Sequence, residues 1–225
     1  MDQSLRLTFV FMSGLVAMAT QTSPPTVDPY DLHVSAVELK EDDITKPVAD
    51  IGQSLGMGIS IEYVLSAETN APPQPLRKIS AAVPDGTAKQ VLGRVTDLDP
   101  AYSLVRHGNM LNLVPKDVLA DPAYVLNRKF SVIQIRKSSD VVDAVMQVVD
   151  QLPGKREQLA VLQLGGSLSF SEPWDTTFQN MTVREALDEI AQHRAQTQGW
   201  QLLGSGRFRY LVFHERLVPT PAQQP

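Results

Sequence analysis

Residue types that commonly carry catalysis or bind metals are few in this chain, and their spacing fits ordinary surface roles. Glu189 and His193 lie four residues apart in a segment with helical periodicity, so both side chains share one helix face and could bind a metal ion weakly. A plain surface pair is the simpler explanation of this spacing. His107 falls in a predicted turn, and none of the four histidines belongs to an HExxH motif. The sequence therefore predicts no metal site and no cofactor.

Carboxylates and serines form no catalytic pattern either. The acidic run at residues 41–43 precedes a predicted helix, where negative charge is favourable at the N-terminal end of the helix dipole. A calcium loop needs more ligands and a glycine turn than this run, or Asp97 and Asp99, supply. Ser167 follows two glycines, but its segment lacks the closing glycine of a nucleophile elbow and enters a predicted strand. We therefore expect the protein not to be an enzyme.

The elements that position these residues occur twice, about 95 residues apart. Thr87 and Gln90 form a predicted capping box at the start of one helical pattern, and Thr182 and Glu185 form another. Four apolar positions of the first pattern recur at a shift of 95: Ala88, Val91, Leu92 and Val95 become Val183, Ala186, Leu187 and Ile190. An earlier helical pattern recurs at a shift of 97: Ile44, Val48, Ile51 and Leu55 become Val141, Val145, Val148 and Leu152. A repeated unit of this size indicates two small domains of one fold.

The predicted order of elements is β-α-β-β-α-β-β, read twice. We expect an α+β fold of two tandem small units, each a mixed sheet with two helices on one face. The chain divides into five predicted segments: a signal peptide (1–19), a flexible linker (20–29), a first α/β unit (30–127), a second α/β unit (128–216) and a disordered tail (217–225).

The first 19 residues have the features of a secretory signal peptide. Arg6 supplies positive charge, Leu7 to Ala19 is mostly apolar, and Ala17-Met18-Ala19 fits the small-x-small pattern of a cleavage site. The alternative of an uncleaved anchor is disfavoured, because a spanning helix needs roughly 20 apolar residues. We expect cleavage after Ala19 and a soluble periplasmic or secreted protein.

The net charge and the lack of cysteine disfavour some classes of partner and of stabilising bond. The formal net charge is −5, which disfavours nucleic acid, whose binding depends on Lys and Arg neutralising phosphates. The chain has no cysteine, so disulfides and thiolate metal sites are absent and stability must come from packed cores. Proteins or small molecules of the cell envelope are the partners in keeping with export.

The segments with the most characteristic patterns lie at matching places in the two units. In the first, a strand at 59–63, the sequence Gly-Thr-Ala-Lys-Gln-Val-Leu at 86–92, and a hairpin at 102–106 and 109–115 follow one another. In the second, residues 181–190 and 209–213 supply the matching helix and last strand. These segments resemble the secretin and TonB short N-terminal (STN) domain, in two tandem copies. The resemblance implies a non-enzymatic periplasmic protein beside outer-membrane channels or receptors. Because no barrel follows the second unit, we expect a free-standing adaptor.

Two functions fit these patterns. The first is an adaptor that binds an outer-membrane channel, receptor or regulatory membrane protein by adding a partner strand to an exposed sheet edge. Trp174 is predicted to lie in a loop, either exposed at a binding hot spot or packed on its own domain. We expect the edges at 110–114 and 208–213, with the contact residues Leu111, Leu113, Trp174, Tyr210 and Leu211. The alternative is a small-ligand or glycan site between the units, with stacking surface from Trp174, Tyr63 and Tyr102.

Overall fold

The computed structural model describes residues 27–63, 77–152, 159–163, 168–194, 199–205 and 208–214. The predicted signal peptide, most of the predicted linker and the predicted tail lie outside these residues. Within them, no helix is long and apolar enough to cross a membrane.

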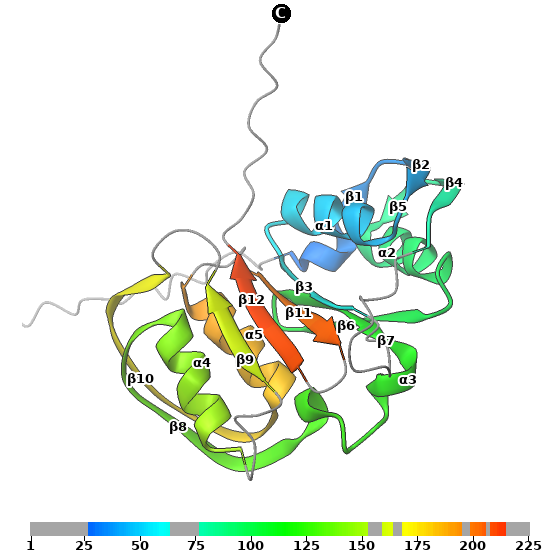
Figure 1. Ribbon diagram of the computed structural model, residues 1–225. Coiled ribbons are helices and arrows are strands. Elements are labelled where there is room, and N and C mark those ends of the chain that lie inside the picture. The colour runs from blue at the N-terminus through cyan, green and yellow to red at the C-terminus, as the bar shows by residue number, and fades with distance from the viewer. Residues whose placement is uncertain are drawn as a thin grey trace, which may run out of the picture.

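The largest element is a six-stranded mixed sheet that contains strands from both predicted units (Figure 1). Strands β3 and β11 join the two parts in parallel, with Ile61 opposite Gln201, and the Tyr63 N–H donates to the Leu202 carbonyl at 3.2 Å. The predicted α+β class is confirmed, whereas the expected separate sheets are one continuous sheet. The strand order is β6 (Tyr102–His107), β7 (Met110–Pro115), β3 (Gly58–Glu62), β11 (Gly199–Ser205), β12 (Phe208–His214) and β9 (Ala160–Gln163).

Helices cover this sheet on both faces. Helices α1 (Thr45–Ser54) and α2 (Ala88–Asp97) pack on the face of β3 from which Ile59 and Ile61 project. Alternate residues of a strand point to opposite faces, and Glu62 accordingly meets α5 (Val183–Arg194), which packs beside α4 (Val141–Asp150). Strand β3 is therefore buried along its whole length. The short helix α3 (Lys116–Leu119) and the 3-10 turn η2 (Val125–Asn127) connect the two halves.

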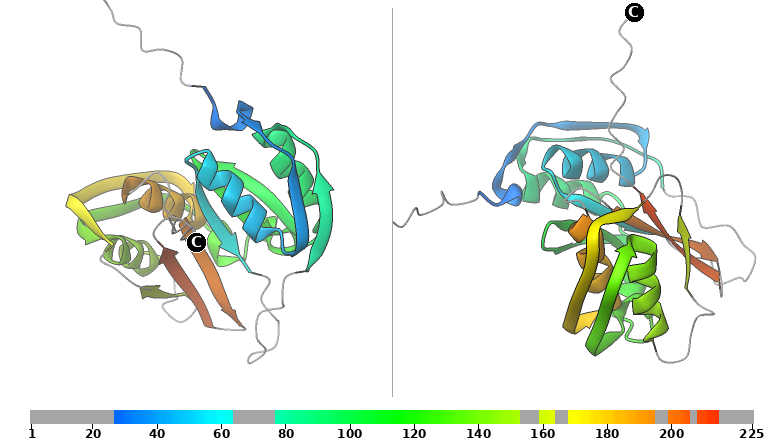
Figure 2. Two further views of the ribbon diagram at one scale, coloured as in Figure 1. Left: turned by 90° about the horizontal axis from the view of Figure 1, so that it is seen from above. Right: turned by 90° about the vertical axis from the view of Figure 1, so that its left-hand side faces the viewer.

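Two β-ribbons run over the outer side of the helices (Figure 2). Strand β2 (Val37–Asp42) pairs antiparallel with β4 (Ile79–Val83), and Leu39 and Val83 join the core around α1 and α2. Strand β8 (Lys129–Asp140) pairs with β10 (Ser169–Thr182), and Ile133 and Ile135 join the core around α4 and α5. A short pair, β1 (His33–Val34) and β5 (Gly86–Thr87), follows the turn η1 (Pro29–Asp31). Each helix pair thus lies between a ribbon and the sheet, rather than on one face of a sheet that is otherwise open.

Helix starts follow local signals in the sequence. The Thr87 N–H donates to Gln90 Oε1 at 3.0 Å, and the Gln90 N–H donates to Thr87 Oγ1 at 3.3 Å, which confirms the first capping box. Thr182 and Glu185 make the same exchange at 2.7 and 3.2 Å. Each box satisfies two backbone N–H groups that a helix start leaves unpaired. The caps fix where α2 and α5 begin, so the apolar positions behind them face the core.

Candidate functional site

Leu111 and Leu113, two of the predicted contact residues, lie inside the sheet rather than at its edge. Both belong to β7, which pairs with β6 on one side and with β3 on the other. Their side chains are fully buried in the core around α1 and α2. A partner strand cannot pair with β7 while the sheet is intact, because the main-chain groups of both its sides are already used.

Tyr210 and Leu211 occupy a similar interior place in β12. This strand pairs with β11 and with β9, and Leu211 is fully buried while Tyr210 is partly exposed. We expected both closing strands, β7 and β12, to lie at a sheet edge, but each lies inside the sheet with a paired strand on both sides. The second strand of each hairpin runs parallel to a further strand, β3 or β9, which covers the side that we expected to be free.

Trp174 lies in β10 rather than in a loop, and it is partly buried. Its ring stacks on His193 of α5 at a centroid distance of 4.0 Å and meets Phe170 and Phe178 edge-on at 5.5 and 5.9 Å. Burial lowers the pKa of His193, which favours the neutral ring in this stack. Of the two interpretations of Trp174, the structure shows the one in which the ring packs on its own half of the chain.

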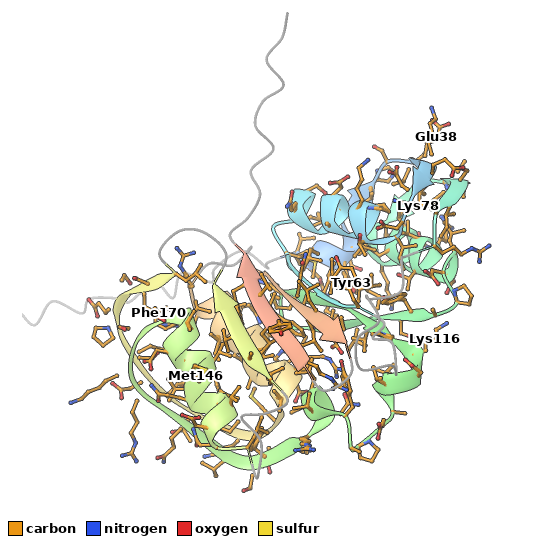
Figure 3. The ribbon with its side chains drawn as sticks, in the orientation of Figure 1. Glu38, Tyr63, Lys78, Lys116, Met146 and Phe170 are labelled. Atoms are coloured by element: carbon orange, nitrogen blue, oxygen red, sulfur yellow. The ribbon has the colours of Figure 1, made fainter. Side chains whose placement is uncertain are left out.

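The three aromatic residues expected at a ligand site between the units belong to different cores. Tyr102 is 1% exposed in the core of α1 and α2, and Tyr63 packs against the same core at the end of β3 (Figure 3). Trp174 packs against the core of α4 and α5. These rings do not offer one stacking surface. A cavity of about 500 Å³ lies elsewhere, lined by Ser169, Phe170, Ser171, His193 and Arg194.

A buried ion pair joins the two halves of the chain beneath α5. Arg184 donates through Nε and Nη2 to the two carboxylate oxygens of Glu62, the second at 3.1 Å, and through Nη1 to Asn127 Oδ1 at 2.7 Å. Glu62 has no exposed surface, and burial raises the pKa of its carboxyl while Arg184 acts in the opposite direction. A buried carboxylate needs such a compensating charge. The pair connects β3 with α5, 122 residues further along the chain.

Asp188 of α5 forms a second buried cluster. Its carboxylate accepts hydrogen bonds from Asn112 Nδ2 at 2.7 Å and from Trp200 Nε1 at 2.9 Å, and His107 Nδ1 lies 3.6 Å away. Burial raises the pKa of Asp188, and the contact with Asp188 raises the pKa of His107. The four side chains come from β6, β7, α5 and β11, so this cluster also spans both halves.

Both clusters suit a structural role better than a catalytic one. Glu62 and Asp188 are fully enclosed and are satisfied by fixed side chains, whereas a catalytic group must reach a substrate. In the part of the chain that the structure describes, no three side chains of metal-binding type lie together. Neither cluster was apparent from the sequence, because the members are 76 and 122 residues apart.

Gln147 of α4 and Gln151, the C-cap residue that follows α4, cover the edge of β8. Gln151 accepts from the Gln134 N–H at 3.0 Å and donates to the Gln134 carbonyl at 2.9 Å. Gln147 makes the same two bonds with Arg136, at 2.8 and 3.1 Å. The side-chain amides thereby reproduce the hydrogen bonds of a neighbouring strand. This edge of β8 is closed to pairing with another chain.

The matching edge of β2 is open among the described residues. There, β2 pairs with β4 alone, and a groove of about 110 Å³ lies between β2 and α1. An unpaired edge beside a groove can accept an extended segment through main-chain hydrogen bonds. We therefore take it as the candidate functional site, and we name it the β2 groove. Its lining residues are Val37, Glu38, Leu39, Asp42, Lys46, Pro47, Asp50 and Ile51.

No family model, curated protein or solved structure matches this chain. Function must therefore be inferred from the residues and their geometry. The resemblance to the STN domain consequently stays a proposal.

Proposed function

We propose that this protein is an exported, non-catalytic adaptor of the bacterial cell envelope that binds a partner protein through an exposed strand edge. The observation that carries this proposal is the difference between the two ribbons. Side-chain amides close the edge of β8, whereas the edge of β2 opens on a groove. Proteins commonly protect free strand edges against unwanted pairing. An open edge in the same molecule as a protected one is suited to pairing with a chosen partner.

The proposal includes two tandem copies of a fold that resembles the STN domain. The pairing β6-β7-β3 has a counterpart in β11-β12-β9, since each contains an antiparallel hairpin whose second strand runs parallel to the third. A residue with left-handed backbone also interrupts β2 and β8 at related places, Glu41 (φ 55°) and Lys137 (φ 47°). The resemblance implies a place in the periplasm, with an outer-membrane channel, receptor or regulatory membrane protein as the partner.

The test is to isolate the mature protein, residues 20–225, with its envelope partner and to compare amide hydrogen exchange in the free and bound states. Among the described residues, the strands longer than two residues with an unpaired edge are β2, β4, β6, β9 and β10. We expect slower exchange along one of these edges, because new main-chain hydrogen bonds protect amides. A bound partner that leaves all five strands unprotected would count against strand addition.

A small-ligand function is the second candidate, and the cavity beside α5 favours it. His193 and Phe170 line this cavity, and Trp174 stacks on the same histidine. Aromatic faces of this kind can stack on a sugar ring. A saturable rise in melting temperature with a sugar, abolished in Trp174→Ala, would support this function over the adaptor. A screen without any such rise would count against it.

A further inference from the structure

We infer that the β2 groove binds an extended peptide segment that carries lysine or arginine side chains and pairs with β2 as an additional strand. This inference rests on the proposed strand-edge function, to which it adds the place of binding and the chemistry of the partner. Three features support it: the main-chain groups of β2 that face α1, the apolar floor of the groove, and its acidic rim.

The first feature is the main chain of β2 beside α1. Glu41 in β2 and Lys137 in β8 both have left-handed backbone, and they lie 96 residues apart (137 − 41). At the same shift, Glu38 and Lys40 of β2 correspond to Gln134 and Arg136 of β8. On β8, Gln134 and Arg136 direct their N–H and C=O groups to the side chains of Gln151 and Gln147. Glu38 and Lys40 are therefore the positions where an added strand would find main-chain partners.

Helix α1 does not supply the glutamines that close the other ribbon. At the shift of 97 that relates the two helices, Asp50 and Ser54 correspond to Gln147 and Gln151. Ser54 Oγ donates to the Ile51 carbonyl of its own helix at 2.7 Å. A carboxylate accepts hydrogen bonds but donates none, so Asp50 cannot reproduce the paired bonds of an amide. The chemistry of α1 thus leaves the edge of β2 available.

The second feature is the floor of the groove, which is apolar. Val37 and Leu39 of β2 line it on one side, and Pro47 and Ile51 of α1 line it on the other. Alternate side chains of an added strand would point into this floor and away from it. The volume of about 110 Å³ suits small aliphatic side chains at the inward positions. Burial of these side chains would add to the main-chain hydrogen bonds.

The third feature is an acidic rim, whose carboxylates outnumber the lysine side chains that could neutralise them. Glu38, Asp42 and Asp50 line the groove together with a single cation, Lys46, whose Nζ lies 3.3 Å from Asp42. Asp50 is exposed and makes no ion pair within the described ranges. Glu38 meets Lys40 at 3.2 Å, but both side chains are about two thirds or more exposed, so this pair is weak. A basic segment complements this rim, and such complementarity selects partners and speeds their encounter.

The edge of β6 fits an added strand less well. Arg106, near the end of β6, donates from Nη1 to both carboxylate oxygens of Asp28, at 2.7 and 2.9 Å. Its guanidinium also lies 4.4 Å from the centre of the Tyr30 ring. The start of the described chain is thereby held against this end of β6. The β2 groove has no comparable cover among the described residues.

The experiment uses mature protein and two ten-residue peptides, one alternating lysine with valine and the other alternating glutamate with valine. We expect the lysine peptide to bind and to slow amide exchange at Glu38 and Lys40, with the glutamate peptide at least about tenfold weaker. Glu38→Lys/Asp50→Lys should weaken the lysine peptide by about tenfold or more. The matched control Asp97→Lys/Asp117→Lys makes the same change in net charge at exposed sites on α2 and α3, and it should bind like the wild type.

The possible outcomes separate this inference from the proposed function. Equal losses in the two double variants would reduce the effect to net charge and overturn the assignment to the groove. Failure of the lysine peptide to bind would overturn the basic character of the partner. Protection at β4, β6, β9 or β10 without protection at β2 would exclude the β2 groove but keep strand addition. Peptide binding that protects no strand amide would contradict both. Circular dichroism of each variant checks that the fold is retained.

Discussion

At the residue scale, the junction between the halves depends most on the charges of Glu62 and Arg184. Arg184→Leu leaves the carboxylate of Glu62 buried without its cation, and we expect a loss of roughly 3–5 kcal/mol in the free energy of unfolding. The double variant Glu62→Leu/Arg184→Leu removes both charges and should recover a large part of that loss. Urea denaturation of four proteins gives the comparison: the wild type, Arg184→Leu, Glu62→Leu and the double variant. A double variant that is as unstable as the sum of the single variants would show that the pair is not coupled.

The environment of His107 predicts that the stability contributed by this side chain is lost as the pH rises. Asp188, Glu189 and Glu185 of α5 all raise the pKa of His107 above its ordinary 6.5, with Asp188 the largest cause. A cation favoured by the folded state contributes stability that is fully present below the unfolded-state pKa and is lost as the pH rises through the folded-state pKa. The pKa of Asp188 is also raised in the folded state, so its contribution to stability likewise falls as the pH rises, at lower pH than that of His107.

The measurement for His107 is the free energy of unfolding between about pH 5 and pH 8, the range in which histidine changes charge. The lowered pKa of His193 makes stability rise with pH in both proteins, so the difference between the wild type and His107→Gln isolates His107. We expect the stability of the wild type relative to His107→Gln to fall as the pH rises. Nuclear magnetic resonance titration of the ring should give a pKa above that of a free histidine. Profiles with the same slope in the wild type and in His107→Gln would contradict the proposed contact between a charged His107 and Asp188.

At the element scale, Gln147 and Gln151 at the C-terminal end of α4 should stabilise β8 and keep its edge from pairing with other molecules. Gln147→Ala/Gln151→Ala removes the four hydrogen bonds to β8 and two further bonds, to Asp143 and to the Gln147 carbonyl, at a partly exposed site, each worth about 0.5–1.5 kcal/mol at most. We expect faster amide exchange at Gln134 and Arg136, a small loss of stability and more self-association. Gln179→Ala, at an exposed position of β10, is the control. Sedimentation of both variants at several concentrations detects the self-association.

Glutamine side chains like those that cover the edge of β8 should also close the β2 groove. Asp50→Gln/Ser54→Gln places amides on α1 at the positions that α4 uses, and we expect binding of the lysine peptide to be lost. Asp50→Asn/Ser54→Asn makes the same change in charge with side chains one methylene shorter, and it should retain more of the binding. Titration calorimetry compares the two. Equal binding by both variants would mean that charge alone, and not closure of the edge, controls the groove.

The sequence predicted elements that depend on near neighbours better than those that depend on distant ones. The boxes at Thr87 and Thr182 are confirmed, because capping involves residues three positions apart. The order of the strands was not predictable, since Ile61 meets Gln201 across 140 residues (201 − 61). The site was hidden for a similar reason. Glu38 and Asp50 become neighbours of one groove only after β2 has folded over α1.

At the scale of the whole molecule, the shared sheet makes the two halves depend on each other. Strand β3 lies between β7 and β11, and its Glu62 side is covered by α5 from the other half (Figure 1). If the halves separated, β3 would gain a free edge, and Glu62, Asn112 and Met110 would lose the contacts that bury them. Each of these changes costs free energy, because buried polar groups lose partners and apolar surface meets water.

The mature chain should therefore unfold in one cooperative transition rather than in two. In calorimetry, we expect a single peak whose calorimetric and van't Hoff enthalpies agree, as two-state unfolding requires. Trp200, which donates to Asp188 at the junction, offers a fluorescence signal that should change at the same temperature as the far-ultraviolet circular dichroism. A fragment that ends at residue 127 should unfold at a much lower temperature, since it lacks β11 and α5.

Two separate peaks, or a fragment as stable as the whole chain, would mean that the junction between the halves holds two independent domains together only weakly. In that case, a partner bound at β2 could act on the first half alone. If the single transition is observed, strand addition at β2 should raise the melting temperature of both halves together, because a ligand that binds the folded chain stabilises everything that unfolds with its site.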